Sequence, residues 1–300
     1  MHSIRAGTYS IVAVDKRAGE MGAAIKSRSF AIGSRSLWAE PGVGVVVAQG
    51  TVEQSYGPLG LALMRGGKSP PQTLKSLLAT DLRPNVRQVA MIDARGRVAA
   101  HTGKNCIPES GHVTGRGFAS QANFVSSKRV WRAAGSAFRR LKGSLAERML
   151  WALEAGKNAD RDAEGVRSAA VIVISTRPSG MPWEGRVLDL RIESSDNPLK
   201  ELRRLLQVQE AYSHAAVGDE SFGKGDPERG KREYSKAVAM ARENSELRFW
   251  QGIQLLNHGD EKKGVAILKK VLHQRDKKAM IRELESLGLV ELPGEGKKSA

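Results

Sequence analysis

The sequence predicts a layered α+β domain followed by a smaller domain made only of helices. Three observations predict this division. Strand-length apolar segments alternate with amphipathic helical segments up to about residue 195. From Pro198 onward the segments have helical periodicity. Within this second part, glycines recur at a spacing of 34 residues, which is typical of helix–turn–helix repeats.

The first strands form a hairpin. Residues 9–15 and 20–28 run apolar at strand length, and a glycine-containing turn, Lys16-Arg17-Ala18-Gly19, joins them. Residues 29–34 are expected to form a loop. The β-branched run at 43–49, preceded by a lead-in at 37–42, predicts a third strand buried on both faces.

Helices and further strands follow. Tyr56 opens a helix that runs to Gly66-Gly67, and a second helix starts at Ser69 with two prolines in its first turn. Later segments are expected to be strands at 87–92, 97–102, 118–124, 168–175 and 186–192, a long loop at 103–117 and a helical region at 127–155. Sheets with helices between and outside them form a layered α+β domain.

The second part contains an internal repeat. Gly218 and Gly252 are 34 residues apart, and the same offset relates Gly225-Asp226 to Gly259-Asp260. This period is the signature of tetratricopeptide repeats. Because two repeats cannot bury a continuous core, helices at 198–214 and 277–289 are expected to cap the ends. The predicted organisation is a leader at 1–7, domains at 8–195 and 198–292, and a disordered tail at 293–300.

The chain is strongly basic. Its net charge is +16, and residues 101–150 hold nine basic and two acidic side chains. The basic residues of the predicted helical region are Lys128, Arg129, Arg132, Arg139, Arg140, Lys142 and Arg148. Such a face attracts polyanions, but a solvated helix face is the favoured interpretation, because no recognition motif and few aromatic residues accompany the charges. Nucleic acid is therefore not the expected partner.

Several classes of site are not expected. One cysteine, Cys106, rules out a disulfide framework and multi-cysteine metal sites, and we interpret it as a buried small side chain. His101 and His112 match no metal spacing, so neither a metal nor another cofactor is expected. No apolar run spans a membrane and no signal-peptide core precedes the first strand, which favours a cytoplasmic location. Exposed sheet edges favour self-association into a homo-oligomer.

A set of short motifs in the first 195 residues resembles a known family. The motifs include Thr8-Tyr9-Ser10-Ile11-Val12-Ala13, Gly19-Glu20-Met21-Gly22, Ser27-Arg28-Ser29-Phe30-Ala31-Ile32-Gly33, Gln49, Tyr56-Gly57-Pro58, Arg87-Gln88, Asp93-Ala94-Arg95-Gly96, Gly111-His112 and Gln121-Ala122-Asn123. Together they resemble the family catalogued as domain of unknown function 1028, which is placed among proteins with an Ntn-hydrolase-like fold.

The resemblance implies a four-layer αββα sandwich and a nucleophile at Thr8, where mature chains of the family begin. Residues 1–7 would then have to be removed, because an N-terminal threonine uses its own free amine as base. Asn123 is the candidate oxyanion donor. Candidates for substrate contact are Ser27, Gln49, Arg87 and His101. Relatives usually carry glycine at the position of Ala122, so its methyl group is expected close to the site.

Two functional hypotheses follow. In the first, the protein is an amidohydrolase that uses Thr8 as N-terminal nucleophile on a small amide or peptide substrate. In the alternative, the scaffold is non-catalytic and the C-terminal repeats bind a protein or peptide partner. Intact mass separates them, because only the first requires loss of residues 1–7.

Overall fold

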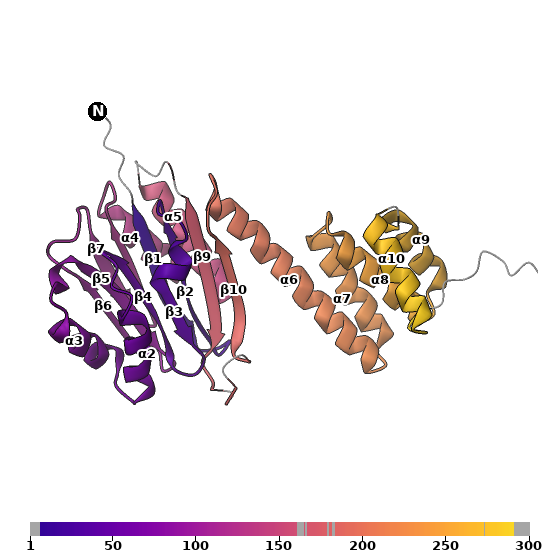
Figure 1. The fold of residues 1–300 in the computed structure, drawn as a ribbon, viewed down its shortest axis with the longest axis horizontal. Helices are drawn as coiled ribbons and strands as arrows, with labels where there is room; N and C mark the ends of the chain where they lie inside the picture. The colour runs from indigo at the N-terminus through magenta and orange to yellow at the C-terminus, as the bar shows by residue number, and fades with distance from the viewer. Residues whose placement is uncertain are drawn as a thin grey trace, which may run out of the picture. The chain divides into compact units, whose positions relative to one another are not determined.

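The computed structural model describes residues 7–160, 165, 167–178, 180–181, 184–272 and 274–290 (Figure 1). The chain divides into two compact units between Leu206 and Gln207. The predicted leader, apart from Gly7, and the predicted tail at 293–300 lie outside the described residues. No helix within these ranges is both long and apolar enough to cross a membrane.

The first unit contains two antiparallel sheets. Among the described residues, the larger sheet has the strand order β10-β9-β2-β1-β8-β7 and the smaller one the order β3-β4-β5-β6. The larger sheet comprises β1 (Thr8–Asp15), β2 (Glu20–Ser27), β7 (Gly111–Gly115), β8 (Phe118–Asn123), β9 (Ser168–Ser175) and β10 (Arg186–Ile192). The smaller sheet comprises β3 (Leu37–Glu40), β4 (Gly44–Gly50), β5 (Arg87–Asp93) and β6 (Val98–Thr102). The mixed α+β class is confirmed.

The two sheets face each other, and helices cover their outer faces (Figure 1). Helices α4 (Arg129–Arg140) and α5 (Leu145–Ala159) pack on β1, β2 and β8, and α2 (Tyr56–Arg65) and α3 (Pro70–Thr80) pack on the smaller sheet. A short 3₁₀ helix, Pro84–Val86, precedes β5. Apolar side chains gather in three clusters, one between each pair of neighbouring layers. Strand alternation therefore decides which layer each side chain faces.

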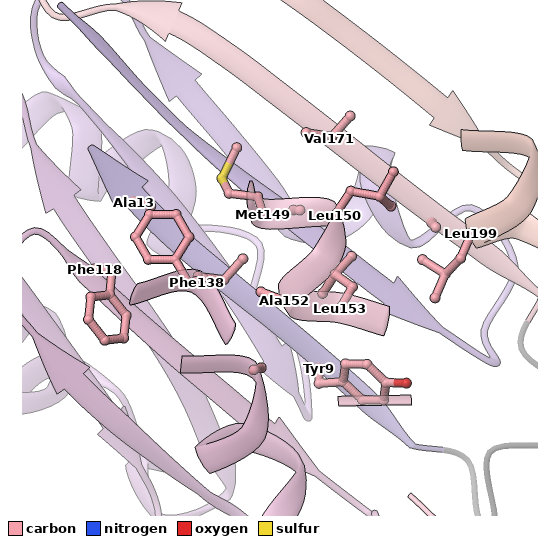
Figure 2. Close-up of a cluster of buried hydrophobic side chains, with 14 of the residues drawn as sticks. Tyr9, Ala13, Phe118, Phe138, Met149, Leu150, Ala152, Leu153, Val171 and Leu199 are labelled. Carbon is pink, nitrogen blue, oxygen red and sulfur yellow. The ribbon is translucent and has the colours of Figure 1, made fainter. Parts of the chain in front are cut away.

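Figure 2 shows the cluster between the larger sheet and its helices. Tyr9 and Ala13 of β1 contribute to it, as do Met149 and Leu153 of α5. Leu199, from the first residues of α6 (Pro198–Gly223), also belongs to this cluster. Ala122 occupies the position where relatives usually carry glycine. Ala122 belongs to this cluster, so its methyl group packs toward the helices and not toward the space between the sheets.

Two elements lie where loops were expected, so those two loop predictions are wrong, and a third element lies in the predicted lead-in at 37–42. Strand β7 occupies part of the predicted loop at 103–117, because its backbone pairs with β8 although its sequence is glycine-rich. Strand β3 pairs with β4 in the predicted lead-in. A short helix, α1 (Ile32–Ser36), lies partly in the predicted loop at 29–34. Tertiary pairing supplies the hydrogen bonds that local sequence does not signal.

The predicted helix at 127–155 is two helices. Gly143 adopts a φ of 141°, which a residue with a side chain rarely adopts. Ser144 then begins α5 with a capping box, because its side chain accepts from the Glu147 amide and the Glu147 carboxylate accepts from the Ser144 amide. The chain therefore reverses direction between α4 and α5.

The second unit is all-helical, as predicted. Its helices are the remainder of α6, α7 (Pro227–Met240), α8 (Ser245–Asn257), α9 (Glu261–Val271) and α10 (Arg275–Ser286). The 34-residue repeat is visible in the contacts. A side chain at Gly218 would meet Tyr234 and the Gly230 carbonyl, and one at Gly252 would meet Leu268 and the Gly264 carbonyl. Glycine at these positions lets paired helices approach closely.

Candidate active site

Thr8 lies at the start of β1, beside Asn123 at the end of β8. Its side chain is on the same face of β1 as Val12 and Val14, which pack between the two sheets, so Thr8 faces the smaller sheet. The Thr8 hydroxyl oxygen is 2.7 Å from the hydroxyl oxygen of Ser27, the last residue of β2. Thr8 is 8% exposed and Ser27 is fully covered. The structure therefore brings together two hydroxyl groups at one end of the space between the sheets.

Three amide side chains join the two sheets at this end. Gln49 Nε2 donates to the Thr8 carbonyl oxygen at 3.3 Å and to Gln88 Oε1 at 2.7 Å. Asn123 Nδ2 donates to the same Gln88 oxygen at 2.9 Å. Gln88 Nε2 in turn donates to the Ala122 carbonyl at 2.9 Å. Gln88 is the centre of this network, because its oxygen orients the amides of both Gln49 and Asn123.

The network continues one pleat deeper. The Ser10 hydroxyl donates to Gln49 Oε1 at 2.7 Å and accepts from Gln121 Nε2 at 3.2 Å. Ser10 and Gln121 are almost fully buried. The oxygen Oε1 of Gln121 is also buried and has no hydrogen-bond partner among the described residues. The polar end of the inter-sheet space therefore extends from Thr8 to Gln121, where the apolar core begins.

Arg87 does not lie with Thr8. Its side chain is on the same face of β5 as Val89 and Met91, so it faces helices α2 and α3 on the outer side of the smaller sheet. Its Nε and Nη2 donate to the two carboxylate oxygens of Asp81 at 2.7 and 3.2 Å. These bonds lower the pKa of Asp81 to about 2. Arg87 and Asp81 line an open cavity of about 430 Å³ together with Tyr56 and Glu53.

The two histidines lie on the edge strands of the two sheets, His101 on β6 of the smaller sheet and His112 on β7 of the larger one. His101 Nε2 is 3.0 Å from the Pro84 carbonyl and does not contact Thr8. His112 Nδ1 is 2.8 Å from the Thr102 hydroxyl, which accepts from Gln88 Nε2 at 3.0 Å. Burial and the nearby His101 lower the pKa of His112. Of the two, His112 is the histidine connected to the amide network.

Cys106 is buried, as predicted. Its thiol donates to the Arg87 carbonyl at 3.3 Å, and burial raises its pKa. A raised pKa keeps the sulfur protonated, which does not favour a nucleophile. Across the described ranges, no group of three or more histidine, cysteine or acidic side chains could hold a metal ion.

Charged groups are buried on the other face of β1 and β2. Lys26 is 1% exposed, and its ammonium lies 3.8 Å from the centre of the Tyr9 ring. Desolvation lowers the pKa of Lys26 to about 7. Asp160 accepts from the Ser126 amide and hydroxyl at 3.0 and 2.7 Å, and it also lies against Gly7. A side chain at Gly7 would come within 3.1–3.2 Å of surrounding atoms, so Gly7 itself is closely packed.

The candidate residues therefore separate into two groups. The structure brings Thr8, Ser27, Gln49 and Asn123 together, whereas Arg87 and His101 lie elsewhere. Sequence reasoning did not select three residues with direct roles in the network, namely Ser10, Gln88 and Gln121. The available signal was polar side chains at alternate positions near strand ends, on the faces that are apolar further along the same strands.

The chain is similar to proteins of one known family. The family described as "Family of unknown function (DUF1028)" matches residues 8–202. A solved structure, the protein SPO2555 from Silicibacter pomeroyi of the same family, is 28% identical with a TM-score of 0.61. The match covers 67% of this chain and 85% of that one. No curated protein matches.

Proposed function

Because the chain belongs to the DUF1028 family, whose function is unknown, its activity has to be argued from its own residues, and we propose that it is an amide-bond hydrolase with an Ntn-hydrolase-like fold. The nucleophile is Thr8. The observation that carries the proposal is the 2.7 Å approach of the Thr8 and Ser27 hydroxyls at the edge of a buried amide network. The order helices–sheet–sheet–helices supports assignment to the αββα class.

The first step is removal of residues 1–7. The Thr8 hydroxyl oxygen attacks the Gly7 carbonyl carbon, and the peptide C–N bond breaks. The Thr8 nitrogen takes up the proton that the hydroxyl releases and becomes a free amine. Water then hydrolyses the resulting ester, which gives a Gly7 carboxylate and restores the hydroxyl. Gly7 is buried beside Asp160, and Thr8, Gln49 and Asn123 are nearly covered. Removal of the segment would free the Thr8 amine.

The second step acts on substrate. A free α-amine has a pKa of about 7.7–8.0, so it can take the proton of the adjacent hydroxyl near neutral pH. The Thr8 oxygen attacks the substrate carbonyl. Asn123 Nδ2 carries a second hydrogen besides the one donated to Gln88, and that hydrogen is available to the oxyanion. The amine's proton passes to the leaving amine, and water hydrolyses the acyl-enzyme.

Substrate recognition is assigned to Ser27 and Gln49, which lie beside Thr8. The substrate class is a small amide or a peptide. Arg87 is bound to Asp81 on the outer face, so it is not part of this assignment. Neither step requires a cofactor.

The alternative function is a non-catalytic scaffold whose helical repeats bind a protein or peptide. One observation favours it, namely the recurrence of the Gly218–Gly230 contact at Gly252–Gly264, which is the packing expected of stacked repeats. Stacked helical repeats form extended binding surfaces. In this case residues 1–7 stay attached, and the hydroxyl pair at Thr8 is structural.

The test is the intact mass of the protein purified from its native host, followed by N-terminal sequencing. We expect a chain that begins at Thr8. The Thr8→Ala variant should keep residues 1–7, whereas Thr114→Ala, an exposed threonine on β7, should be processed like the parent. If the parent chain keeps residues 1–7 in cells where the protein is folded and abundant, the hydrolase proposal is contradicted and the scaffold function remains.

A further inference from the structure

Four turns that are distant in the sequence meet at the end of the first unit opposite Thr8. The β1–β2 turn and the β7–β8 turn are neighbours, because the Val14 amide donates to the Gly117 carbonyl at 2.9 Å. The β5–β6 turn joins them, since a side chain at Gly96 would lie 3.0 Å from the Lys16 side chain. The α4–α5 connection lies there too, because Arg148, near the start of α5, forms an ion pair with Asp15 at 3.1 Å.

These turns carry exposed cations, which we call the basic end. Its members are Lys16, Arg17, Arg95, Arg116, Arg139, Arg140 and Lys142. Within the part of the chain that the structure describes, none of these side chains forms an ion pair. The sequence places these residues in four separate segments, so only the fold makes them one surface.

The acidic residues at the same turns do not neutralise this surface. Asp15 is bound to Arg148, and Asp93 is bound to Arg97. The Glu147 carboxylate accepts from the Ser144 amide and hydroxyl. Glu20 is the remaining carboxylate, and burial together with the charge of Asp15 raises its pKa. The basic end is therefore a strongly positive field with most nearby negative charge already paired.

We propose that the basic end binds the phosphate backbone of double-stranded nucleic acid without reading its sequence. Five of the seven cations are arginines, whose planar guanidinium groups match phosphate oxygens in pairs. Single strands are held by bases stacked on aromatic side chains, and interfacial membrane helices insert apolar ones. Among the large hydrophobic side chains exposed in the described residues, only Leu141 lies at these turns. A duplex backbone needs cations alone.

This inference differs from the expectation that nucleic acid is not a partner. That expectation rests on the absence of a recognition motif and on the small number of aromatic residues among the charges. Those absences argue against base-specific readout and against stacking, whereas backbone binding depends only on charge. The sequence alone suggests a single helix face at 128–148, whereas Arg148 is turned inward to Asp15 and the four turns add cations from outside that segment.

The test is fluorescence anisotropy of a labelled 20-base-pair duplex of mixed sequence, titrated with the full chain at several salt concentrations. If most of the seven cations each neutralise one phosphate, log K should fall with log[salt] with a slope of about −4 to −6. Two unrelated duplex sequences should bind equally. Affinity should fall by roughly 10³ between 50 and 200 mM salt.

A matched pair of variants locates the site. Arg139→Glu/Arg140→Glu and Lys269→Glu/Lys270→Glu make the same change in net charge, each at two adjacent exposed residues in the last turn of a helix. The first should weaken duplex binding at least tenfold and reduce the slope by about two, while the second should stay within twofold of the parent. Circular dichroism checks that both fold.

Three results would overturn the proposal. They are no binding at 50 mM salt, equal losses in the two double variants, and equal or tighter binding to vesicles containing anionic phospholipid, compared per phosphate. The third result would assign the basic end to a membrane surface. None of these outcomes depends on whether Thr8 is a nucleophile.

Discussion

The hydroxyl oxygens of Thr8 and Ser27 lie 2.7 Å apart, because β1 begins where its neighbour β2 ends, at the same end of the larger sheet. The pair is nearly covered, and within the described residues Ser27 is the hydrogen-bond partner of the Thr8 hydroxyl. Ser27 also accepts from the Ser29 amide at 3.1 Å, which fixes its position. The orientation of the Thr8 side chain therefore depends on Ser27.

Replacement of this partner should affect both stability and processing. We expect Ser27→Ala to lower the free energy of unfolding by about 1–3 kcal/mol, because it leaves the buried Thr8 hydroxyl unpaired. Loss of residues 1–7 should slow at least tenfold. Urea unfolding and time-resolved intact mass measure the two effects. The exposed control Ser213→Ala should change stability by less than about 0.5 kcal/mol. Unchanged processing in Ser27→Ala would remove Ser27 from the mechanism.

Gln88 should be a positioning residue for the amide network. Gln88→Met keeps a similar volume but leaves the amide hydrogens of Gln49 and Asn123 without their shared acceptor. We expect a loss of roughly 1–3 kcal/mol of stability for each unpaired amide. In the Gln88→Met variant, kcat for amide hydrolysis should fall by a larger factor than KM rises, since Asn123 acts on the oxyanion. Gln207→Met, at an exposed position, is the control. A variant with parental kcat would contradict this role.

Lys26 should make stability depend on pH. Its pKa is about 7 in the folded chain, against an ordinary value of 10.5, because burial beside Tyr9 disfavours the charge. Between these pH values the unfolded chain binds more protons, so this group makes the protein more stable as pH rises. From pH 9 to pH 7 the contribution falls by roughly 2–3 kcal/mol.

Lys26→Met removes that dependence. We expect the variant to be more stable than the parent at pH 7, with the difference shrinking as pH approaches 10. Asp160, Lys157 and Arg28 also act on Lys26, and they are unchanged in the variant. Urea unfolding at pH 7, 8 and 9 measures the difference, and Lys200→Met at an exposed site should show none. A constant difference at all three values would show that Lys26 is not desolvated.

The Asp81–Arg87 pair should stabilise the outer face of the smaller sheet. Asp81→Asn should cost about 3–5 kcal/mol near neutral pH, because it leaves a nearly buried guanidinium without its paired charge. The pKa of Asp81 is lowered to about 2, so this stability is present above pH 4 and is lost as pH falls toward 2. Parent and variant should therefore converge in acid.

Glu53→Gln is the matched control, since Glu53 lies 3.7 Å from the same guanidinium and its side chain is 42% exposed. An exposed ion pair contributes less than about 1 kcal/mol. Urea unfolding between pH 2.5 and 7 measures both variants. Equal losses in the two would show that Arg87 is not held mainly by Asp81.

The helical repeat gives a prediction at its glycines. Gly230→Ala should destabilise the second unit by about 1–3 kcal/mol, because the added carbon would lie 2.7 Å from the Phe222 ring. Gly223→Ala adds the same atom where nothing lies within 4 Å. Alanine there should be neutral or stabilising by up to about 1 kcal/mol. Thermal unfolding followed by circular dichroism distinguishes them, and equal effects would mean that α6 and α7 are not closely packed.

Much of the fold follows from local signals in the sequence. The hairpin at β1 and β2, the buried runs of β4 and β9, and the proline-started helices have periodicity and turn residues that local physics determines. The 34-residue offset also predicts the helix pairing of the second unit. Strands β3 and β7 could not be predicted in this way. Each pairs with the strand that follows it in the chain, but β3 has only four residues and β7 begins and ends with glycine, so neither carries a strong strand signal of its own.

The sequence by itself determined the polar identity of Thr8, Ser27, Gln49 and Asn123, and the family to which the chain belongs. Only the tertiary structure decided which of them meet. Strand alternation turns Arg87 outward and its neighbour Gln88 inward, so adjacent residues on β5 belong to different layers. The same folding gathers four basic turns into one surface. Both outcomes depend on sheet register and packing, which relate residues far apart in the chain.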